Sequence, residues 1–492
     1  MLWKAKQKME KKKDIFKLVR YGLAIIQSAI TLLFLYFLAE LDMLPKKIFF
    51  TAVAVLIILC VLNVVLQFRK ISGIIMMVVG IIMSIVLAVG CGYIYKTTDV
   101  VDKISGANEQ VDNVAVYVLT DDTAKSIGDA ADYTFGILSD KGRMATDKTI
   151  EEINKKVNKE ISIKEYDDFF TLVDALYAGD IKAIILNEAY LDVIIETEGY
   201  EDFTEKVREL LMTEVKTEVE WYEEDTGIAF NEDIFTLYIS GIDTYGTVAK
   251  TSRSDVNIIA VVNTKTKQVL LVSTPRDYYV PLSISNGVKD KLTHAGIYGI
   301  NCSKDTLASL YGVDIQYYFR LNFDGFIKII DALGGITVHS DYAFTTRHYG
   351  ATINVGENAL NGEQALGFAR ERYALAEGDR QRGKNQMEVI RAVLNKLASS
   401  KLLYNYYDVM DAISDCFQTS MSADMIQRLV KMQINDMKKW NVVSYSVDGN
   451  GTKSTTYSMP NTTAYVMVPD ESTITHAKEL IEQVINGQVI SQ

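Results

Sequence analysis

The chain has 492 residues and a formal net charge of -12. This length allows two or three domains, and the acidic balance argues against nucleic-acid binding through a general electrostatic field. The four cysteines form no CxxC pair, which excludes a disulfide framework and, with four dispersed histidines, argues against a zinc site. Cys60 and Cys91 lie in long apolar runs, so Cys302 and Cys416 leave room for one disulfide at most.

Three apolar runs begin the chain, at residues 21–39, 48–68 and 71–95. They contain 19, 21 and 25 residues without Asp, Glu, Lys or Arg, and about 20 such residues are needed for one membrane-spanning helix. A cleaved signal peptide has a shorter apolar region and no further spans behind it. The sequence therefore predicts a membrane domain of three helices.

The basic residues predict the orientation of this domain. The first 20 residues hold eight Lys or Arg, which favours a cytoplasmic N-terminus. Three crossings then place everything after Lys96 outside the cell. Residues 1–96 hold 13 basic and 4 acidic residues, a net of +9, so the remainder carries -21. In so acidic an exported part, a site for an anion has to be assembled locally from basic side chains.

The exported part is predicted to have an α/β fold. Residues 97–112 are polar and are expected to be a linker. Residues 113–230 alternate strand-like runs such as IKAIILN with helical runs such as DKTIEEINKKVNKE, which indicates a small α/β accessory domain. Residues 231–492 begin with the strand-like runs IFTLYISGID, VNIIAVVNT and QVLLVSTPRD, which predict a larger mixed α/β domain with a central sheet.

Helices follow these strands. FDGFIKIIDALGG predicts a helix closed by a glycine pair and followed by the strand ITVHS. NGEQALGFARER predicts a second helix, and KNQMEVIRAVLNKLAS predicts a longer one. The long helix carries an apolar face, formed by Met387, Ile390, Val393, Leu394 and Leu397. TITHAKELIEQVI predicts a closing helix near the C-terminus.

Arginine and aspartate recur at the ends of the predicted strands, where α/β proteins build their sites. These residues are Asp243, Arg253, Asp255, Arg276 and Asp277, and the stretch GFARERYALAEGDRQRGKNQ adds Arg370, Arg372, Asp379, Arg380, Arg382 and Gln386. Arginine binds phosphate oxygens in a planar, bidentate manner, and Mg²⁺ takes one or two carboxylates together with substrate phosphate. The pattern predicts a diphosphate site with Mg²⁺, or Mn²⁺ in its place, held by Asp243 and Asp255.

Each part of this pattern also has a structural interpretation. A neighbouring Arg–Asp pair is commonly a simple ion pair, and Arg380 and Lys384 can be solvated side chains. FARER alone can be a helix end whose basic residues favour the helix dipole. His294 is expected to be structural or to line the substrate site rather than to act as a base.

Five blocks in order carry a family resemblance. GIDTYG, RSDVNIIAVVNTKTKQVLLVSTPRDYYV, KLTHAGIYG, FDGFIKIIDALGGITV and LNGEQALGFARERY…GDRQRGKNQ resemble the LytR-CpsA-Psr family of Gram-positive cell-wall enzymes. The match covers residues 233–398. Three membrane helices and an accessory domain before the catalytic domain are similar to the capsule-type branch of the family.

The resemblance implies a phosphotransferase that moves a glycopolymer from undecaprenyl diphosphate to the 6-hydroxyl of N-acetylmuramic acid in peptidoglycan, with Mg²⁺ assisting. It implies that the polyprenyl tail lies in a hydrophobic pocket within the α/β domain. By position in the family's motifs, Asp243 and Asp255 match metal-associated acids, and the diphosphate-contacting arginines match Arg253, Arg276, Arg370 and Arg372. Asp379, Arg382 and Gln386 match a downstream polar motif. The family often has arginine directly before that glutamine, whereas this chain has Asn385, which leaves the contacts of Arg382 and Gln386 open.

The expected reaction is attack by the muramic acid hydroxyl on the sugar-linked phosphorus, with a carboxylate such as Asp379 or a metal-site aspartate taking the proton. Capsular polysaccharide is the favoured polymer, with teichoic acid as an alternative, and other wall-assembly proteins are candidate partners. Two other classes remain open. One is a polyprenyl-diphosphate hydrolase with the same site, and the other is a non-enzymatic membrane regulator that signals through its cytoplasmic tail.

Overall fold

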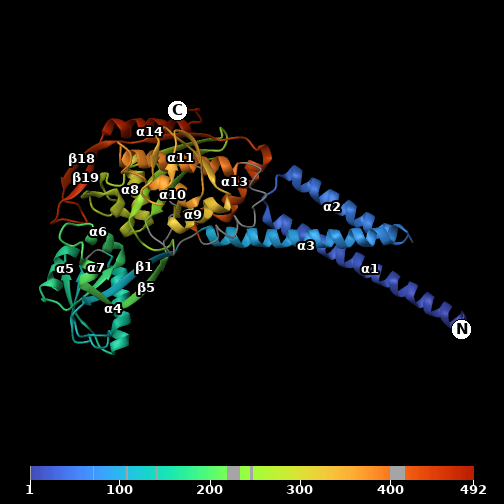
Figure 1. Cartoon of the computed structure of the whole chain (residues 1–492), viewed down its shortest axis with the longest axis horizontal. Helices are drawn as coiled ribbons and strands as arrows, with labels where there is room; N and C mark the ends of the chain where they lie inside the picture. The colour runs from blue at the N-terminus through green and yellow to red at the C-terminus, as the bar shows by residue number, and fades with distance from the viewer. Residues whose placement is uncertain are drawn as a thin grey trace. The chain divides into compact units, whose positions relative to one another are not determined.

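The computed structural model describes residues 2–69, 71–106, 109–139, 142–218, 233–243, 248–398 and 416–491 (Figure 1). They form two compact units. The first contains the N-terminal residues up to Ser105 together with Met421–Lys438, and the second contains the other described residues. The predicted mixed α/β fold with three apolar N-terminal helices is confirmed.

Three helices dominate the first unit, and among the described residues they are the ones long and apolar enough to cross a membrane. They are α1 (Leu2–Leu41), α2 (Lys46–Gln67) and α3 (Ser72–Ile104). Pro45 stands at the start of α2, where its missing N–H costs no helical hydrogen bond. The helix α13 (Ala423–Asp436) belongs to the same unit, where Lys431 pairs with Asp42.

The predicted linker at residues 97–112 is wrong over most of its length. α3 continues as a helix to Ile104, and the strand β1 begins at Glu109. The polar residues that suggested a linker lie on the last turns of α3, where Lys103 pairs with Asp99 one turn earlier. An ion pair between residues four positions apart stabilises a solvent-facing helix. Polar residues at this spacing are therefore as compatible with a helix as with a linker.

A buried polar network joins the apolar helices. Asn63 on α2 donates to the side chain of Gln27 on α1 (3.0 Å), and Gln67 donates to Asn63 (3.1 Å). The Nε of Arg20 donates to Gln67 (3.1 Å). Hydrogen bonds of this kind hold apolar helices together, because hydrocarbon offers their polar groups no other partner.

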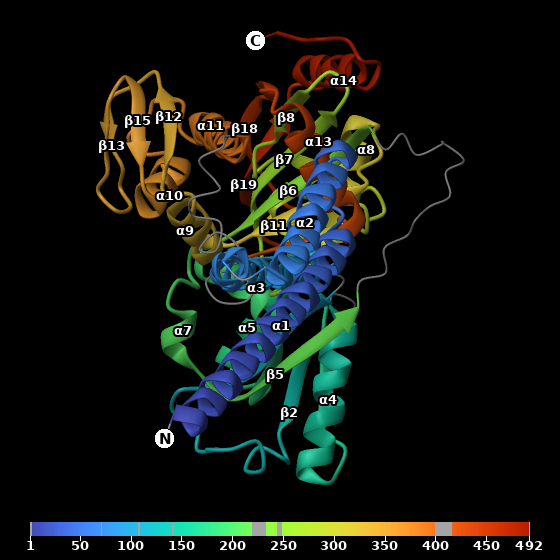
Figure 2. The same ribbon diagram turned by 90° about the vertical axis from the view of Figure 1, so that its right-hand side faces the viewer.

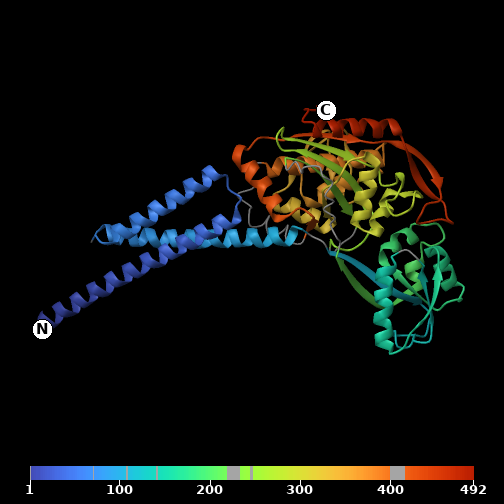
Figure 3. The ribbon, with the colours of Figure 1, turned by 180° about the vertical axis from the view of Figure 1, so that it is seen from behind.

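The accessory domain is a five-stranded sheet in the order β3-β2-β4-β1-β5. The strand β1 is antiparallel to β4 and β5, whereas β2 is parallel to β3 and β4. Asp168 accepts hydrogen bonds from the N–H groups of Phe170 and Thr171 and so caps α5. Figure 3 shows this domain in cyan and green. Its elements are β1 (Glu109–Leu119), β2 (Thr134–Leu138), α4 (Arg143–Val157), β3 (Ser162–Tyr166), α5 (Phe169–Tyr177), β4 (Ala183–Asn187), η1 (Glu188–Tyr190), α6 (Leu191–Ile195), α7 (Phe203–Lys206) and β5 (Val207–Glu218).

The larger domain has a six-stranded mixed sheet in the order β16-β11-β6-β7-β8-β17. The neighbours β6, β7 and β8 are antiparallel, and β11 and β17 pair in parallel with β6 and β8. The strands are β6 (Ile234–Ile242), β7 (Ser254–Asn263), β8 (Gln268–Ser273), β11 (Tyr317–Leu321), β16 (Phe417–Thr419) and β17 (Asn441–Ser446). The predicted strands IFTLYISGID, VNIIAVVNT and QVLLVSTPRD correspond to β6, β7 and β8.

The two faces of this sheet carry different helices. Tyr238 of β6 and Tyr318 of β11 pack in one core with α8 (Ile300–Tyr311) and α14 (Glu471–Ile485). Because side chains alternate along a strand, Leu237, Ile239 and Phe319 face the opposite side. There lie α9 (Phe323–Ala332), α10 (Gly362–Arg370) and α11 (Asp379–Leu397).

Short elements complete the larger domain. Figure 2 shows β12, β13 and β15 beside α10, and this group shares a core with α11 through Val389 and Ala392. The remaining elements are β9 (Tyr279–Pro281), β10 (Lys289–Lys291), η2 (Leu292–Tyr298), β12 (Ile336–Ser340), β13 (Phe344–Thr345), β14 (Thr352–Ile353), β15 (Gly356–Leu360), β18 (Gly449–Ser454) and β19 (Ala464–Pro469).

Candidate head-group and lipid-tail site

A cavity of about 580 Å³ lies between the sheet and the helices α9, α10 and α11. Its lining divides by chemistry. Apolar side chains line one part, namely Leu237, Ile239, Phe319, Leu321, Phe323, Phe326, Ile329, Leu366, Ile390, Val393, Leu394 and Leu397. Charged and polar side chains line the other part, namely Glu196, Asp243, Asp255, Arg276, Arg347, His348, Arg370, Arg372, Arg382 and Gln386.

Strand pairing brings the sequence-predicted residues of β6, β7 and β8 together. Ile242, the last residue of β6, pairs with Ser254, the first residue of β7. Asp243 and Asp255 therefore lie at one edge of the sheet, although 12 positions separate them in the chain. The segment after β8 reaches the same edge, because Ser273 pairs with Ile258 of β7.

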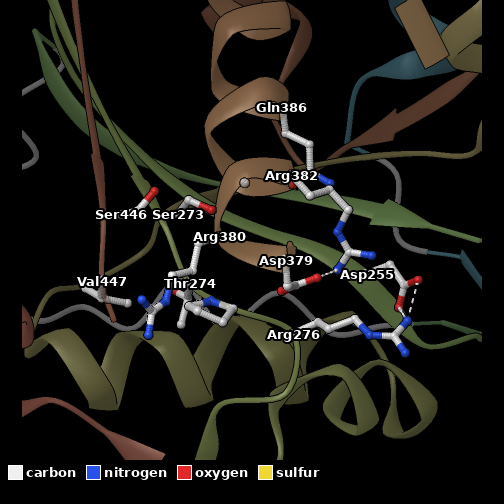
Figure 4. A pocket seen from close by; sticks show the side chains of 12 residues that line it. Asp255, Ser273, Thr274, Arg276, Asp379, Arg380, Arg382, Gln386, Ser446 and Val447 are labelled. Carbon is white, nitrogen blue, oxygen red and sulfur yellow. Dashed lines mark hydrogen bonds and ion pairs between the residues drawn. The ribbon is translucent and has the colours of Figure 1, made fainter. Parts of the chain in front are cut away.

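Arg276 and Asp255 form the best-defined pair of the site (Figure 4). One guanidinium nitrogen of Arg276 donates to both carboxylate oxygens of Asp255, at 2.9 and 2.8 Å, and the hydroxyl of Thr293 donates at 3.1 Å. Burial alone would raise the pKa of Asp255, but the guanidinium groups, with Arg276 first, lower it to about 2. The pair is therefore ionised at neutral pH.

Arg370 and Arg372 both line the cavity, on either side of a buried glutamate. The helix α10 ends at Arg370, so the predicted helix NGEQALGFARER stops two residues early and Arg372 lies outside it. Glu371 makes this end rigid, because its carboxylate accepts hydrogen bonds from four backbone N–H groups, those of Arg347, Arg372, Tyr373 and Ala374.

Aromatic rings hold the two arginines in place. The guanidinium of Arg370 lies 4.0 Å from the ring centroid of Phe323, and that of Arg372 lies 4.7 Å from the ring centroid of Tyr373. Cation–π contacts fix an arginine without using its N–H groups. One terminal nitrogen of Arg372 nevertheless donates to the hydroxyl of Tyr373 (2.5 Å), so its other N–H groups are the ones available to an anion. Asp243 is the carboxylate nearest to Arg370, at 3.7 Å.

The first turns of α11 supply the downstream polar residues. Asp379 and Arg382 form an ion pair, and Figure 4 shows Arg382 reaching toward Asp255 and Arg276. Gln386 lines the cavity and donates to the backbone oxygen of Ala369 (3.3 Å).

Asn385, at the position where the family often has arginine, does not line the cavity formed by the described residues. It is buried and donates to the backbone oxygen of Phe368 (3.1 Å). Its role is to join α11 to α10. The two other basic residues of the stretch 367–386 are half-exposed. Arg380 pairs with Asp448, and Lys384 pairs with Glu377.

Arg253 occupies a different place from the other predicted arginines. It is buried, and both terminal nitrogens of its guanidinium bind the carboxylate of Glu196 from the accessory domain. Among the described residues it does not line the cavity, whereas Glu196 does. Glu196, Arg347 and His348 also line the cavity and could not be predicted, because nothing in their local sequence indicates that the fold brings them to this site.

Asp243 and Asp255 have the donor chemistry of a Mg²⁺ site. The pKa of Asp243 is raised by burial and then by the nearby charge of Asp255, and a cation between the two would relieve this repulsion. The described residues contain no group of three or more Asp, Glu, His or Cys placed to hold a metal. Two carboxylates alone would suit only an ion that takes its other ligands from phosphate and water.

Other sequence candidates lie outside this site. His294 is buried and bonds to Asp290 (2.7 Å), which agrees with the expected structural role. Cys302 and Cys416 are both buried, and the disulfide that the sequence left open does not join these two described residues.

The cavity has arginines at one end and an apolar lining elsewhere, so it suits an anionic amphiphile. Together with the three candidate membrane spans, this defines a membrane-associated α/β protein. The chain belongs to the LytR_cpsA_psr family, whose model matches residues 198–478. This match includes every residue that the sequence analysis assigned to the site.

Two relatives and one solved structure are similar to parts of this chain. A protein of Enterococcus faecalis named polyisoprenyl-teichoic acid–peptidoglycan teichoic acid transferase TagU is 36% identical over 202 residues, which are 40% of this chain and 65% of that protein. Biofilm regulatory protein A of Streptococcus mutans is 32% identical over 240 residues, which are 45% of this chain and 58% of that protein. The crystal structure of Bacillus subtilis TagV is 25% identical, covers 53% of this chain and 99% of its own, and has a TM-score of 0.44.

Proposed function

We propose that this chain is a membrane-anchored phosphotransferase that transfers a glycopolymer from a polyprenyl diphosphate carrier to peptidoglycan through a phosphodiester bond. The observation that carries the proposal is the cavity, in which arginine side chains and a long apolar lining form one continuous space. A polyprenyl diphosphate has the same two parts, an anionic head group and a hydrocarbon tail.

The proposed reaction follows from the residues at the polar end. The acceptor hydroxyl oxygen attacks the sugar-linked phosphorus, the bond to the bridging oxygen of the diphosphate breaks, and polyprenyl phosphate leaves. Arg276, Arg370 and Arg372 stabilise the negative charge on the transferring phosphate and on the leaving group. The hydroxyl proton passes to a carboxylate. The candidates are Asp243 and Asp255, which line the cavity, and Asp379, which pairs with the cavity-lining Arg382 but is not itself among the described lining residues.

Mg²⁺ is part of the proposal. Asp243 and Asp255 would hold it, and when bound it would supply positive charge to the phosphate oxygens. The arginines orient the head group independently of the ion. The family's usual donor is undecaprenyl diphosphate and its acceptor is the 6-hydroxyl of N-acetylmuramic acid, and we propose the same pair here.

The polymer is proposed by class. The accessory domain and three membrane helices favour capsular polysaccharide, whereas the name of the Enterococcus faecalis relative favours teichoic acid. Supplying each polymer on the same lipid carrier, in separate assays, distinguishes them by which one is transferred. We also propose that the N-terminus is cytoplasmic and the second unit extracellular, which protease treatment of intact cells tests by cleaving only exported segments.

The decisive experiment uses the full-length protein in lipid nanodiscs with lipid-linked glycan and peptidoglycan fragments. A covalent glycan–peptidoglycan product supports the transferase, and free glycan phosphate with no such product supports the hydrolase instead. The Arg276→Ala variant is expected to lose turnover. Lys384→Ala is the matched control, because this half-exposed lysine of α11 pairs with Glu377 and is not among the described residues that line the cavity. Equal activity in all three proteins would refute the assignment of the site.

A further inference from the structure

The accessory domain places an acidic residue in the head-group site. Glu196 directly follows the short helix α6 and lines the cavity. Its carboxylate oxygens accept hydrogen bonds from the two terminal nitrogens of Arg253, at 2.6 and 2.9 Å. One of these oxygens also lies 3.9 Å from Arg276. Glu196 therefore joins the two arginines that precede and follow the strand pair β7–β8.

The position of Glu196 is fixed by a built interface. The N–H of Val111 in β1 donates to the backbone oxygen of Ala249 (2.9 Å), and the N–H of Thr251 donates back to Val111 (2.8 Å). Ile297 and Met459 of the larger domain pack within the accessory core. The backbone that carries Glu196 is thus held beside Arg253 by strand-like pairing and by a shared core.

The side chains of this pair differ in exposure. The Arg253 side chain is 6% exposed, whereas the Glu196 side chain is 52% exposed. The carboxylate can therefore turn into solvent by rotation of its own side chain, while the guanidinium stays in place. Arg253 does not itself line the cavity formed by the described residues, so Glu196 stands between its guanidinium and the cavity. With that carboxylate turned away, the guanidinium, which also lies 3.4 Å from Asp192, would be opened to the cavity, and its planar donors fit a phosphate.

We propose that Glu196 is an anionic occupant of the phosphate site, which the incoming diphosphate has to displace from Arg253. This inference rests on the proposed function and gives the accessory domain a role in selectivity. A diphosphate carries more charge and more acceptor oxygens than a monophosphate, so it competes better with a fixed carboxylate. Glu196 thereby favours binding of the lipid diphosphate and release of the lipid monophosphate product.

The test is Glu196→Gln, which removes the negative charge and keeps the size of the side chain. It is made in the full-length protein in nanodiscs. The probes are geranylgeranyl monophosphate and geranylgeranyl diphosphate. We expect the variant to bind the monophosphate about tenfold more tightly than the wild type, with a smaller gain for the diphosphate. With the lipid-linked glycan as substrate, KM and kcat are both expected to fall, because the product leaves more slowly.

A matched control is Glu188→Gln. Glu188 pairs with Lys250 (2.8 Å) across the same two domains, but it does not line the cavity formed by the described residues. This variant removes an interdomain ion pair but leaves Glu196 in place. It is expected to bind both lipid phosphates with wild-type affinity. Glu196→Ser provides a second variant without the carboxylate, and thermal unfolding checks the fold of each.

The outcomes separate the two proposals. If the wild type binds neither probe and transfers no glycan, the proposed function fails. If the wild type binds the diphosphate and Glu196→Gln binds the monophosphate no more tightly, the occupant role of Glu196 is overturned. A fall in kcat without any change in monophosphate affinity overturns it too, because a proton-transfer or purely structural role would give that result.

Discussion

Leu394 tests whether the apolar part of the cavity binds a lipid tail. It lies on α11, lines the cavity and is only partly buried by protein. Burying a leucine side chain fully is worth about 1.5–3 kcal/mol. Because the protein already buries part of Leu394, Leu394→Asn should remove about half of this, about 1 kcal/mol, from tail binding. That corresponds to about fivefold weaker binding of a long-chain polyprenyl diphosphate.

The assay compares two ligands on the full-length protein in nanodiscs, geranylgeranyl diphosphate and methyl diphosphate. The substitution should weaken binding of the first and leave the second unchanged, because methyl diphosphate lacks the tail. Val489→Asn is the control, since Val489 is a surface hydrophobe with 72% exposure and does not line the cavity. Equal losses for both ligands, or no loss for the lipid, would refute the assignment of the apolar lining to the tail.

Three further predictions follow from named contacts. Arg370→Ala should lower turnover by at least about 100-fold with little change in melting temperature, because its 24%-exposed side chain lies at the cavity surface; steady-state kinetics and thermal unfolding check this. Burial would raise the pKa of Glu371, but hydrogen bonds from backbone N–H groups outweigh it and lower the pKa. Glu371→Gln should therefore lower the free energy of unfolding by about 1.5–3 kcal/mol at pH 7. This difference disappears as the pH falls through the lowered pKa of Glu371, and unfolding monitored by proteolysis across pH measures it. Asn63→Leu should destabilise the helix bundle by about 1 kcal/mol through loss of the bond to Gln27, measured by unfolding in detergent.

Most of the sheet and its helices could be predicted because their patterns are local. The short, apolar, β-branched runs of β6 and β7 and the glycine pair after α9 each specify an element within a few residues. The linker at residues 97–112 was predicted from polarity, and polarity does not distinguish a solvated helix from a linker. The three apolar spans were predicted, but not the network of Gln27 and Asn63 inside them, because helix packing decides which polar side chains meet.

The site could be predicted in part for the same reason. Asp255 and Arg276 follow strand ends, where the topology of an α/β sheet gathers polar residues. The apolar face of α11 was correctly predicted from the spacing of its residues. The same spacing occurs whether such a face packs on a core or lines a cavity, so the cavity itself could not be predicted. Glu196 could not be found, since its contact with Arg253 joins positions 57 residues apart in two different domains.

Three arginines at or beside this site share one arrangement that bears on selectivity. Arg276 pairs with Asp255, Arg382 with Asp379, and Arg253 with Glu196. Part of the local cluster of basic residues is thus neutralised by its own acids before any ligand arrives, whereas Arg370 lies 3.7 Å from Asp243 and Arg372 donates to the hydroxyl of Tyr373. Buried charge pairs of this kind hold side chains in place at a cost in desolvation. An anion gains from such a site only if it offers enough oxygens to replace the carboxylates. A diphosphate meets that requirement better than a single phosphate, so the acids that neutralise the site also select its ligand.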